Sequence, residues 1–208
     1  MGKVTLQTLQ ALIKNTNTAM TDEIINSITK TTKELKENTL LPDKQGIYAF
    51  FLDKSNDLGK FGSSGQIIYA GLSETNLNSR CNQTHLATGQ TGWSSLRRSL
   101  GAILKLQLNL TAQKRDKNPN KLRADKYKFD EAGEKRLTQW MIKNLKMGYW
   151  PTDKPLTLEN LKKKEENVNI KLKPSLDLDK RTKKFNPLAA ELDSLRKICR
   201  VEVKNSVN

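Results

Sequence analysis

Two short hydrophobic runs, joined by a polar loop that contains glycine, constrain the fold of this chain most. The first run is Gly46–Leu52 and the second is Gln66–Gly71, and both are rich in the β-branched and aromatic residues that strands favour. Between them, Gly62–Gly65 is a turn signal. The two runs therefore predict a β-hairpin in which Tyr48 and Tyr69 point from neighbouring strands.

The remainder of the chain is mostly helical in pattern. Apolar residues recur at helical spacing over residues 4–39, where Thr21–Glu23 is expected to open a second helix. Further elements are predicted as helices over 77–86, 93–108, 131–145, 156–172 and 187–203, and as a third strand over 147–150. A small sheet covered by helices is an α+β fold.

The charge of the chain indicates a polyanionic partner. Its 208 residues include 37 Lys and Arg against 22 Asp and Glu, for a net charge of +15. Such an excess favours nucleic acid first and an anionic membrane surface second. The longest apolar run lies around Tyr48–Leu52 and is too short to span a bilayer. We therefore expect a nucleic-acid partner and no membrane association.

Several other classes of protein are excluded by what the sequence lacks. Residues 1–6 have no apolar segment typical of a signal peptide, so a cytoplasmic protein is expected. Cys81 and Cys199 are too few for a disulfide framework or a zinc site. The sequence has no glycine-rich phosphate loop, so no nucleotide cofactor is expected.

An arginine and the only histidine of the chain follow the predicted hairpin. Arg80 and His85 lie five positions apart in one predicted helix. Together with Gly46–Tyr48 and Tyr69–Gly71, this ordered set resembles the GIY-YIG nuclease family, with Ala70 in place of the isoleucine of the second motif. The stretch 88–102 is similar to a bacterial branch of that family. The resemblance implies an endonuclease whose three-stranded, mainly antiparallel sheet is flanked by helices.

The resemblance also implies roles for the matching residues. Tyr48 would act as the general base, Tyr69 would orient the water or the phosphate, and His85 would transfer a proton or contact the phosphate. Arg80 would hold the scissile phosphate, because its guanidinium group presents a planar fork of donors.

One divalent ion, Mg²⁺ or Mn²⁺, is expected as the cofactor. A hard cation needs a carboxylate ligand. Counting back from Leu172 and Pro174 along the family pattern selects Glu165 as that ligand, although Asp177 replaces an expected asparagine. Glu166 and Glu134 stay open as alternatives.

A basic loop is the expected contact for backbone phosphates. Residues 113–128 hold seven basic and two acidic residues. Phosphate contacts position a nucleic acid without reading its sequence. The predicted contacts are an outward-facing pair on the helix 93–108 and five residues of the loop: Arg97, Arg98, Lys114, Arg115, Lys117, Lys121 and Arg123.

Three regions are expected along the chain. An N-terminal helical extension would cover residues 1–41, a nuclease core 42–178 and a C-terminal helical segment 179–208. The two outer regions would shape a DNA cleft, pair two subunits as a homodimer, or complete the core. The predicted function is a metal-dependent DNA endonuclease of restriction or repair type. The alternative is a non-catalytic nucleic-acid-binding module on the same fold.

Overall fold

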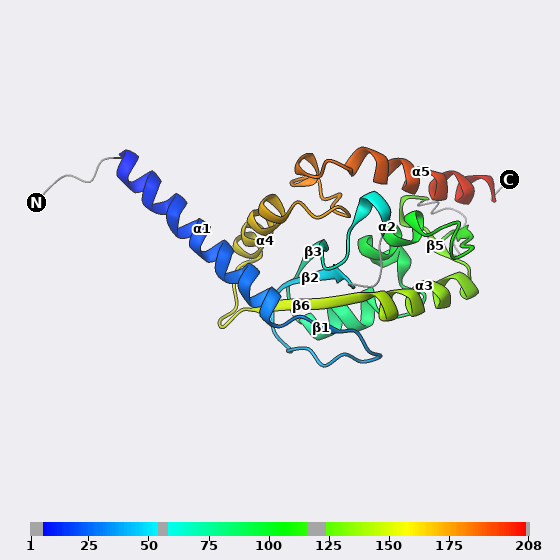
Figure 1. The fold of residues 1–208 in the computed structure, drawn as a ribbon, viewed down its shortest axis with the longest axis horizontal. Helices are drawn as coiled ribbons and strands as arrows, with labels where there is room; N and C mark the ends of the chain where they lie inside the picture. Colours follow the sequence, from blue (N-terminus) through cyan, green and yellow to red (C-terminus); the bar gives the residue numbers. More distant parts are fainter. Residues whose placement is uncertain (1–5, 54–57, 116–123, 207–208) are drawn as a thin grey trace, which may run out of the picture.

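The computed structural model describes residues 6–53, 58–115 and 124–206, with side chains from residue 15 onward. Its centre is an antiparallel sheet with the strand order β1-β6-β2-β3 (Figure 1). These strands are β1 (Lys33–Glu34), β2 (Gly46–Leu52), β3 (Ile67–Ser73) and β6 (Leu145–Pro151). The α+β class and the hairpin are confirmed. The prediction of three strands is wrong by one, because the two-residue β1 is too short to leave a pattern in the sequence.

Strand β2 lies between β3 and β6, and this explains its composition. Six of its seven residues are buried, so it reads as a continuous apolar run. In the register of the sheet, Tyr48 lies opposite Gly71 on β3 and opposite Tyr149 on β6. Gly46 begins the strand at a point where a Cβ atom would lie 2.2 Å from the carbonyl oxygen of Trp150. The glycine of the first motif therefore permits a close approach of two backbones.

Helices cover both faces of the sheet. On one face, α1 (Leu6–Lys30) and α4 (Leu158–Leu172) bury Ile24, Ile28, Leu161 and Val168 against β2 and β3. On the other face, α2 (Ser95–Ile103), α3 (Glu131–Asn144) and α5 (Ala189–Asn205) share the larger hydrophobic cluster with Tyr48 and Phe50. The residues of β2 alternate between these two clusters, as a strand at the centre of a three-layer arrangement requires.

The N-terminal region differs from the prediction. A single helix, α1, runs through Thr21–Glu23, and the Thr21 hydroxyl donates to the carbonyl of Asn17 within it. A threonine in mid-helix can satisfy its hydroxyl in this way, so the expected break is absent. The chain then enters β1 instead of continuing as a helix to residue 39. In Figure 1 the first turns of α1 project beyond the sheet.

The remaining elements follow the predicted order, with additions. Residues Ser79–His85 form a π-helix, Thr91–Trp93 and Ala124–Lys126 are short 3₁₀ turns, and β4 (Ala112–Gln113) pairs with β5 (Lys128–Phe129). Trp93 is 60% exposed and so does not belong to the core. No helix in the described part of the chain is long and apolar enough to cross a membrane.

Candidate active site

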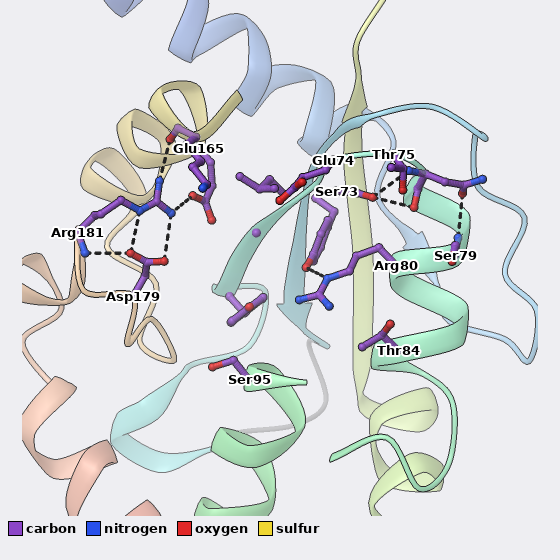
Figure 2. A pocket seen from close by; sticks show the side chains of 16 residues that line it. Ser73, Glu74, Thr75, Ser79, Arg80, Thr84, Ser95, Glu165, Asp179 and Arg181 are labelled. Carbon is purple, nitrogen blue, oxygen red and sulfur yellow. Dashed lines mark hydrogen bonds and ion pairs between the residues drawn. The ribbon is translucent and has the colours of Figure 1, made fainter. Parts of the chain in front are cut away.

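A pocket of about 580 Å³ opens beside β2 and β3, and four of the five predicted catalytic residues line it, while His85 lies outside the lining. Figure 2 shows Arg80 on one side of it, Glu165, Asp179 and Arg181 on the opposite side, and Ser95 at the start of α2. The pocket thus joins elements that are far apart in the sequence. Its lining also includes Tyr48, Tyr69, Gly71, Leu72, Ser73, Glu74, Thr75, Asn76, Ser79, Thr84 and Lys162.

The Tyr48 hydroxyl is the centre of a hydrogen-bond network. It lies 2.6 Å from Nε2 of His85, and Nε of Arg80 donates to it at 3.3 Å. The residue is 0% exposed, although it belongs to the pocket lining. Burial, followed by the neighbouring Tyr69, raises the pKa of Tyr48 well above its ordinary value, although Arg80 opposes the shift. In the free protein the phenol is therefore protonated at neutral pH.

The π-helix explains how Arg80 and His85 reach the same hydroxyl. In an α-helix, residues five positions apart do not lie on one face. In Ser79–His85 the hydrogen bonds run between residues five apart, as in the 2.8 Å bond from the Leu86 amide to the Cys81 carbonyl. This wider turn brings positions 80 and 85 onto one face, towards β2. Single π-turns of this kind often occur at functional sites.

His85 is held in a neutral form by its surroundings. Its ring is fully buried, and burial, with the charges of Arg80, Arg97 and Arg98, lowers its pKa well below the ordinary value. Its Nδ1 lies 2.7 Å from Oγ of Ser94, which also accepts the Arg97 amide as the N-cap of α2. The N-terminus of α2 thereby fixes the orientation of the imidazole.

Tyr69 completes the aromatic part of the site. Its ring centroid lies 6.4 Å from that of Tyr48 and 5.9 Å from that of His85. Burial raises the pKa of Tyr69 to about 12, although Arg80 lowers it. Gly71 makes room for this arrangement, since a Cβ atom there would lie 2.8 Å from the Tyr48 hydroxyl oxygen. The glycine of the second motif is thus explained by the position of the tyrosine of the first.

A carboxylate from α4 faces the tyrosines across the pocket. Glu165 is buried, and its Oε2 accepts from Nη2 of Arg181 at 2.6 Å. Arg181 also binds Asp179, with Nε 2.9 Å from Oδ1. Burial raises the pKa of Glu165 to about 7, because desolvation outweighs the favourable charge of Arg181. The hydrogen bond and the charge of Arg181 oppose this shift without cancelling it.

The comparisons with known proteins bear on this geometry. A family model described as the GIY-YIG catalytic domain matches residues 46–198, more than half of the chain. The chain belongs to the GIY-YIG family. It is an endonuclease, an enzyme that hydrolyses phosphodiester bonds. No curated protein and no solved structure matches it in the corresponding searches. The matched region contains Tyr48 and Glu165 alike, and it also includes much of α5.

The three candidate metal ligands of this GIY-YIG domain lie in different surroundings. Glu165 lines the pocket. Glu134 lies outside that lining, 2% exposed, where its Oε2 accepts from Nη2 of Arg97 at 2.7 Å and from the Thr91 hydroxyl at 2.8 Å. Glu166 is not part of the pocket lining, and its Oε2 lies 3.8 Å from Nζ of Lys163. Of the three, only Glu165 shares the pocket with the two tyrosines.

The predicted phosphate contacts are only partly accessible in the structure. Arg97 and Arg98 were expected to face outward, and this is wrong, because the side chains are 0% and 5% exposed. The guanidinium group of Arg97 donates hydrogen bonds to the Glu134 carboxylate and to the carbonyl of His85. Lys114 and Arg115 are half-buried, with the Arg115 guanidinium 4.0 Å above the ring of Trp93. The remaining three contacts, Lys117, Lys121 and Arg123, lie outside the described residues.

Sequence reasoning missed two residues of the site. Ser94 orients His85, and the signal for it was available, since a serine directly before an apolar helical run is a typical N-cap. Arg181 pairs with Glu165 from a loop that has no periodic pattern. One arginine among 37 basic residues gave no reason to select it.

Proposed function

We propose that this GIY-YIG endonuclease cleaves DNA, depends on one divalent ion, Mg²⁺ or Mn²⁺, and serves restriction or repair. The observation that carries the proposal is the position of the Tyr48 hydroxyl. It lies between Arg80 and His85 and lines a pocket whose opposite wall presents Glu165. Hydrolysis of a phosphodiester needs a base near a water molecule, positive charge near the phosphate, and a carboxylate for a hard cation.

The proton path follows from the donors and acceptors around Tyr48. Nε of Arg80 donates to the phenol oxygen, so the phenol proton is directed to Nε2 of His85. The ring proton of the neutral imidazole then lies on Nδ1 and is donated to Ser94. When His85 accepts the phenol proton, the phenolate beside Arg80 becomes a base that can deprotonate water. In the free protein the raised pKa of Tyr48 and the lowered pKa of His85 oppose this transfer, which keeps the base inactive until a substrate alters the site.

The donor set on the opposite wall fits a hard cation. Mg²⁺ is usually bound by one or two carboxylates and keeps several water molecules. Among the described residues, no group of three or more histidine, cysteine or acidic side chains is arranged to hold a metal. Glu165 offers the single carboxylate that such a site needs, and Asp179 lies beside it on Arg181. The bound ion would supply positive charge to the leaving 3′ oxygen.

Positive charge supports the choice of a polyanionic substrate. The chain carries a net charge of +15, and Arg80 presents its guanidinium group at the pocket. The outer regions, residues 1–41 and 179–208, are proposed to shape the DNA path or to pair two subunits. A helix whose first turns project beyond the sheet suits either role (Figure 1).

Cleavage of supercoiled plasmid by the purified protein tests the proposal. The reaction is run with Mg²⁺, Mn²⁺ or EDTA, beside Tyr48→Phe and Glu165→Ala. Metal-dependent nicking that both substitutions abolish is the expected result. Loss of nicking in Tyr48→Phe alone would assign the metal to Glu134 or Glu166 instead. Salt-sensitive DNA binding without cleavage of any DNA would favour a binding module.

A further inference from the structure

A second pocket of about 310 Å³ adjoins the catalytic pocket. Tyr69, Ser95, Glu165 and Asp179 line both, so the two pockets share one wall. Two arginines line the second pocket only: Arg98 from α2 and Arg196 from α5. The geometry of these two side chains determines what the second pocket can bind.

Both arginines are buried without a carboxylate partner. Arg98 is 5% exposed and Arg196 is 8% exposed, and neither forms an ion pair within the described part of the chain. Nη1 of Arg98 donates to the carbonyls of Thr91 and Gly92 at 3.1 Å and 2.8 Å. Nη1 of Arg196 lies 3.5 Å from the Ser95 hydroxyl. Nε of each has no hydrogen-bond partner among the described residues.

Neighbouring Arg97 shows how this domain treats a guanidinium group that has only a structural role. Arg97 is completely buried, but it forms an ion pair with Glu134 at 2.7 Å. A buried charge without such a partner is strongly unfavourable. Burial, followed by the charge of Arg196, lowers the pKa of Arg98 to about 10, which reflects the same missing counter-charge. Arg98 and Arg196 therefore need an anion that the described residues do not supply.

The acidic side chains of the second pocket do not fill this need. Glu165 and Asp179 are paired with Arg181. Asp177 accepts the Asp179 amide at 2.8 Å. The pocket thus has acidic side chains that are engaged elsewhere and two arginines, Arg98 and Arg196, that have no carboxylate partner among the described residues.

We propose that Arg98 and Arg196, with the Ser95 hydroxyl, form a second phosphate-binding site, which holds a backbone phosphate of the cleaved strand next to the scissile one. The inference rests on the proposed function, since it assumes a polynucleotide in the catalytic pocket. Guanidinium groups match a phosphate through paired donors, and Ser95 opens α2, whose N-terminus also favours an anion. The C-terminal helix α5 thereby contributes directly to substrate binding.

Arg196→Met is the variant that tests the site, because methionine keeps the length of the side chain and removes its charge. Arg200→Met is the matched control, since Arg200 lies one turn later on α5 and pairs with Asp193. Arg98 is left intact because it also binds two carbonyl groups. Without anions, Arg196→Met should melt at or above the temperature of the wild type. Melting clearly below it would show that Arg196 is a structural residue and overturn the proposal.

Inorganic phosphate, added at constant ionic strength, is the probe of anion binding. It should raise the melting temperature of the wild type and of Arg200→Met, by about 2–4 °C for about 1 kcal/mol of linkage. It should leave Arg196→Met unchanged. An equal rise in all three proteins would place the anion elsewhere and overturn the assignment.

Binding of a labelled DNA duplex, with Ca²⁺ replacing Mg²⁺, shows whether the second site binds a DNA phosphate or a free anion. Arg196→Met should weaken binding about tenfold and reduce the salt slope by about one, while Arg200→Met should change affinity less than about twofold. Phosphate binding that Arg196→Met removes, without any loss of DNA affinity, would mean that the site takes a free anion instead. None of these measurements requires cleavage, so they are decided independently of whether the proposed metal-dependent cleavage of DNA is observed.

Discussion

Arg80 and His85 lie five positions apart on one π-helical turn, and both reach the hydroxyl of Tyr48, at 3.3 Å and 2.6 Å. One side chain brings a positive charge to the phenol oxygen and the other an acceptor for its proton. Because both side chains contact the same oxygen, the three residues are expected to act as a single catalytic unit. Removal of the Tyr48 hydroxyl oxygen should therefore abolish the function of all three residues in catalysis.

Tyr48→Phe is therefore expected to reduce the rate of plasmid nicking by roughly 10²–10⁴-fold, the usual contribution of a positioned acid or base. Binding to DNA should persist, because Arg80 still faces the pocket. Single-turnover nicking and a binding titration measure the two quantities. Tyr149→Phe is the control, since Tyr149 lies opposite Tyr48 on β6 and outside the pocket lining. Nicking by Tyr48→Phe within tenfold of the wild type would exclude Tyr48 as the base.

Substitutions of Glu165 and of Glu134 should have different effects, the first on metal binding and the second on stability. Glu134→Gln leaves the buried Arg97 without its counter-charge and should lower the free energy of unfolding by about 3–5 kcal/mol. Glu165→Gln should abolish Mn²⁺ binding, measured by the electron paramagnetic resonance signal of the free ion, while the protein stays folded. Glu166→Gln, one position along α4, is the control for lost charge. Mn²⁺ binding that survives in Glu165→Gln would assign the ion to another residue.

The sequence predicted the centre of the fold well, because the hairpin depends on local chemistry. A continuous apolar run at Gly46–Leu52 with a glycine at its start is the pattern of a central strand, and β2 has those bounds. The helices α3, α4 and α5 were found for a similar reason, since each keeps one apolar stripe. The strand β1 was missed because two residues carry no periodicity.

The site was only partly predictable, because two of its features depend on tertiary contacts. Helical spacing gave no basis for a π-turn, which alone places Arg80 and His85 together. Arg97 and Arg98 were expected outside because arginine is rarely buried, yet the first is covered as the partner of Glu134. Neither the pair Arg97–Glu134 nor the pair Arg181–Glu165 has a fixed spacing in sequence, so no pattern could reveal them.

The titration of Glu165 should be visible in the stability of the protein. Its ordinary pKa of 4.5 is raised to about 7 in the folded state by burial. The folded state then holds the proton more tightly than the unfolded chain, so stability falls as pH rises from about 4.5 to about 7, by at most about 3 kcal/mol. Glu165→Gln imitates the protonated form and does not titrate. Relative to the wild type, it should gain stability over that range.

Urea unfolding of the wild type and of Glu165→Gln between pH 4.5 and pH 8 measures the difference in their free energies of unfolding. The titration of other groups cancels when the two proteins are compared. Glu166→Gln is the control for the removal of a neighbouring carboxyl group from α4. If Glu165→Gln instead became less stable than the wild type towards pH 8, the ion pair with Arg181 would outweigh the cost of burial.

Gly71 should tolerate a side chain better when the Tyr48 hydroxyl is removed. A Cβ atom at position 71 would lie 2.8 Å from that oxygen and 3.0 Å from the ring carbon that carries it. Overpacking of this kind costs about 1–3 kcal/mol, so Gly71→Ala should be destabilised by that amount. Combined with Tyr48→Phe, it should be less destabilised than the sum of the two single changes, with a coupling of about 1 kcal/mol.

Tyr69→Phe provides the matched comparison for this double-mutant cycle of Gly71→Ala and Tyr48→Phe. The nearest Tyr69 atom to the added methyl group is a ring carbon at 3.3 Å, and that carbon remains when the hydroxyl is removed. The coupling between Gly71→Ala and Tyr69→Phe should therefore be close to zero. Equal couplings in the two cycles would mean that Gly71 responds to general packing of the aromatic rings, and that the Tyr48 hydroxyl does not set the requirement for glycine.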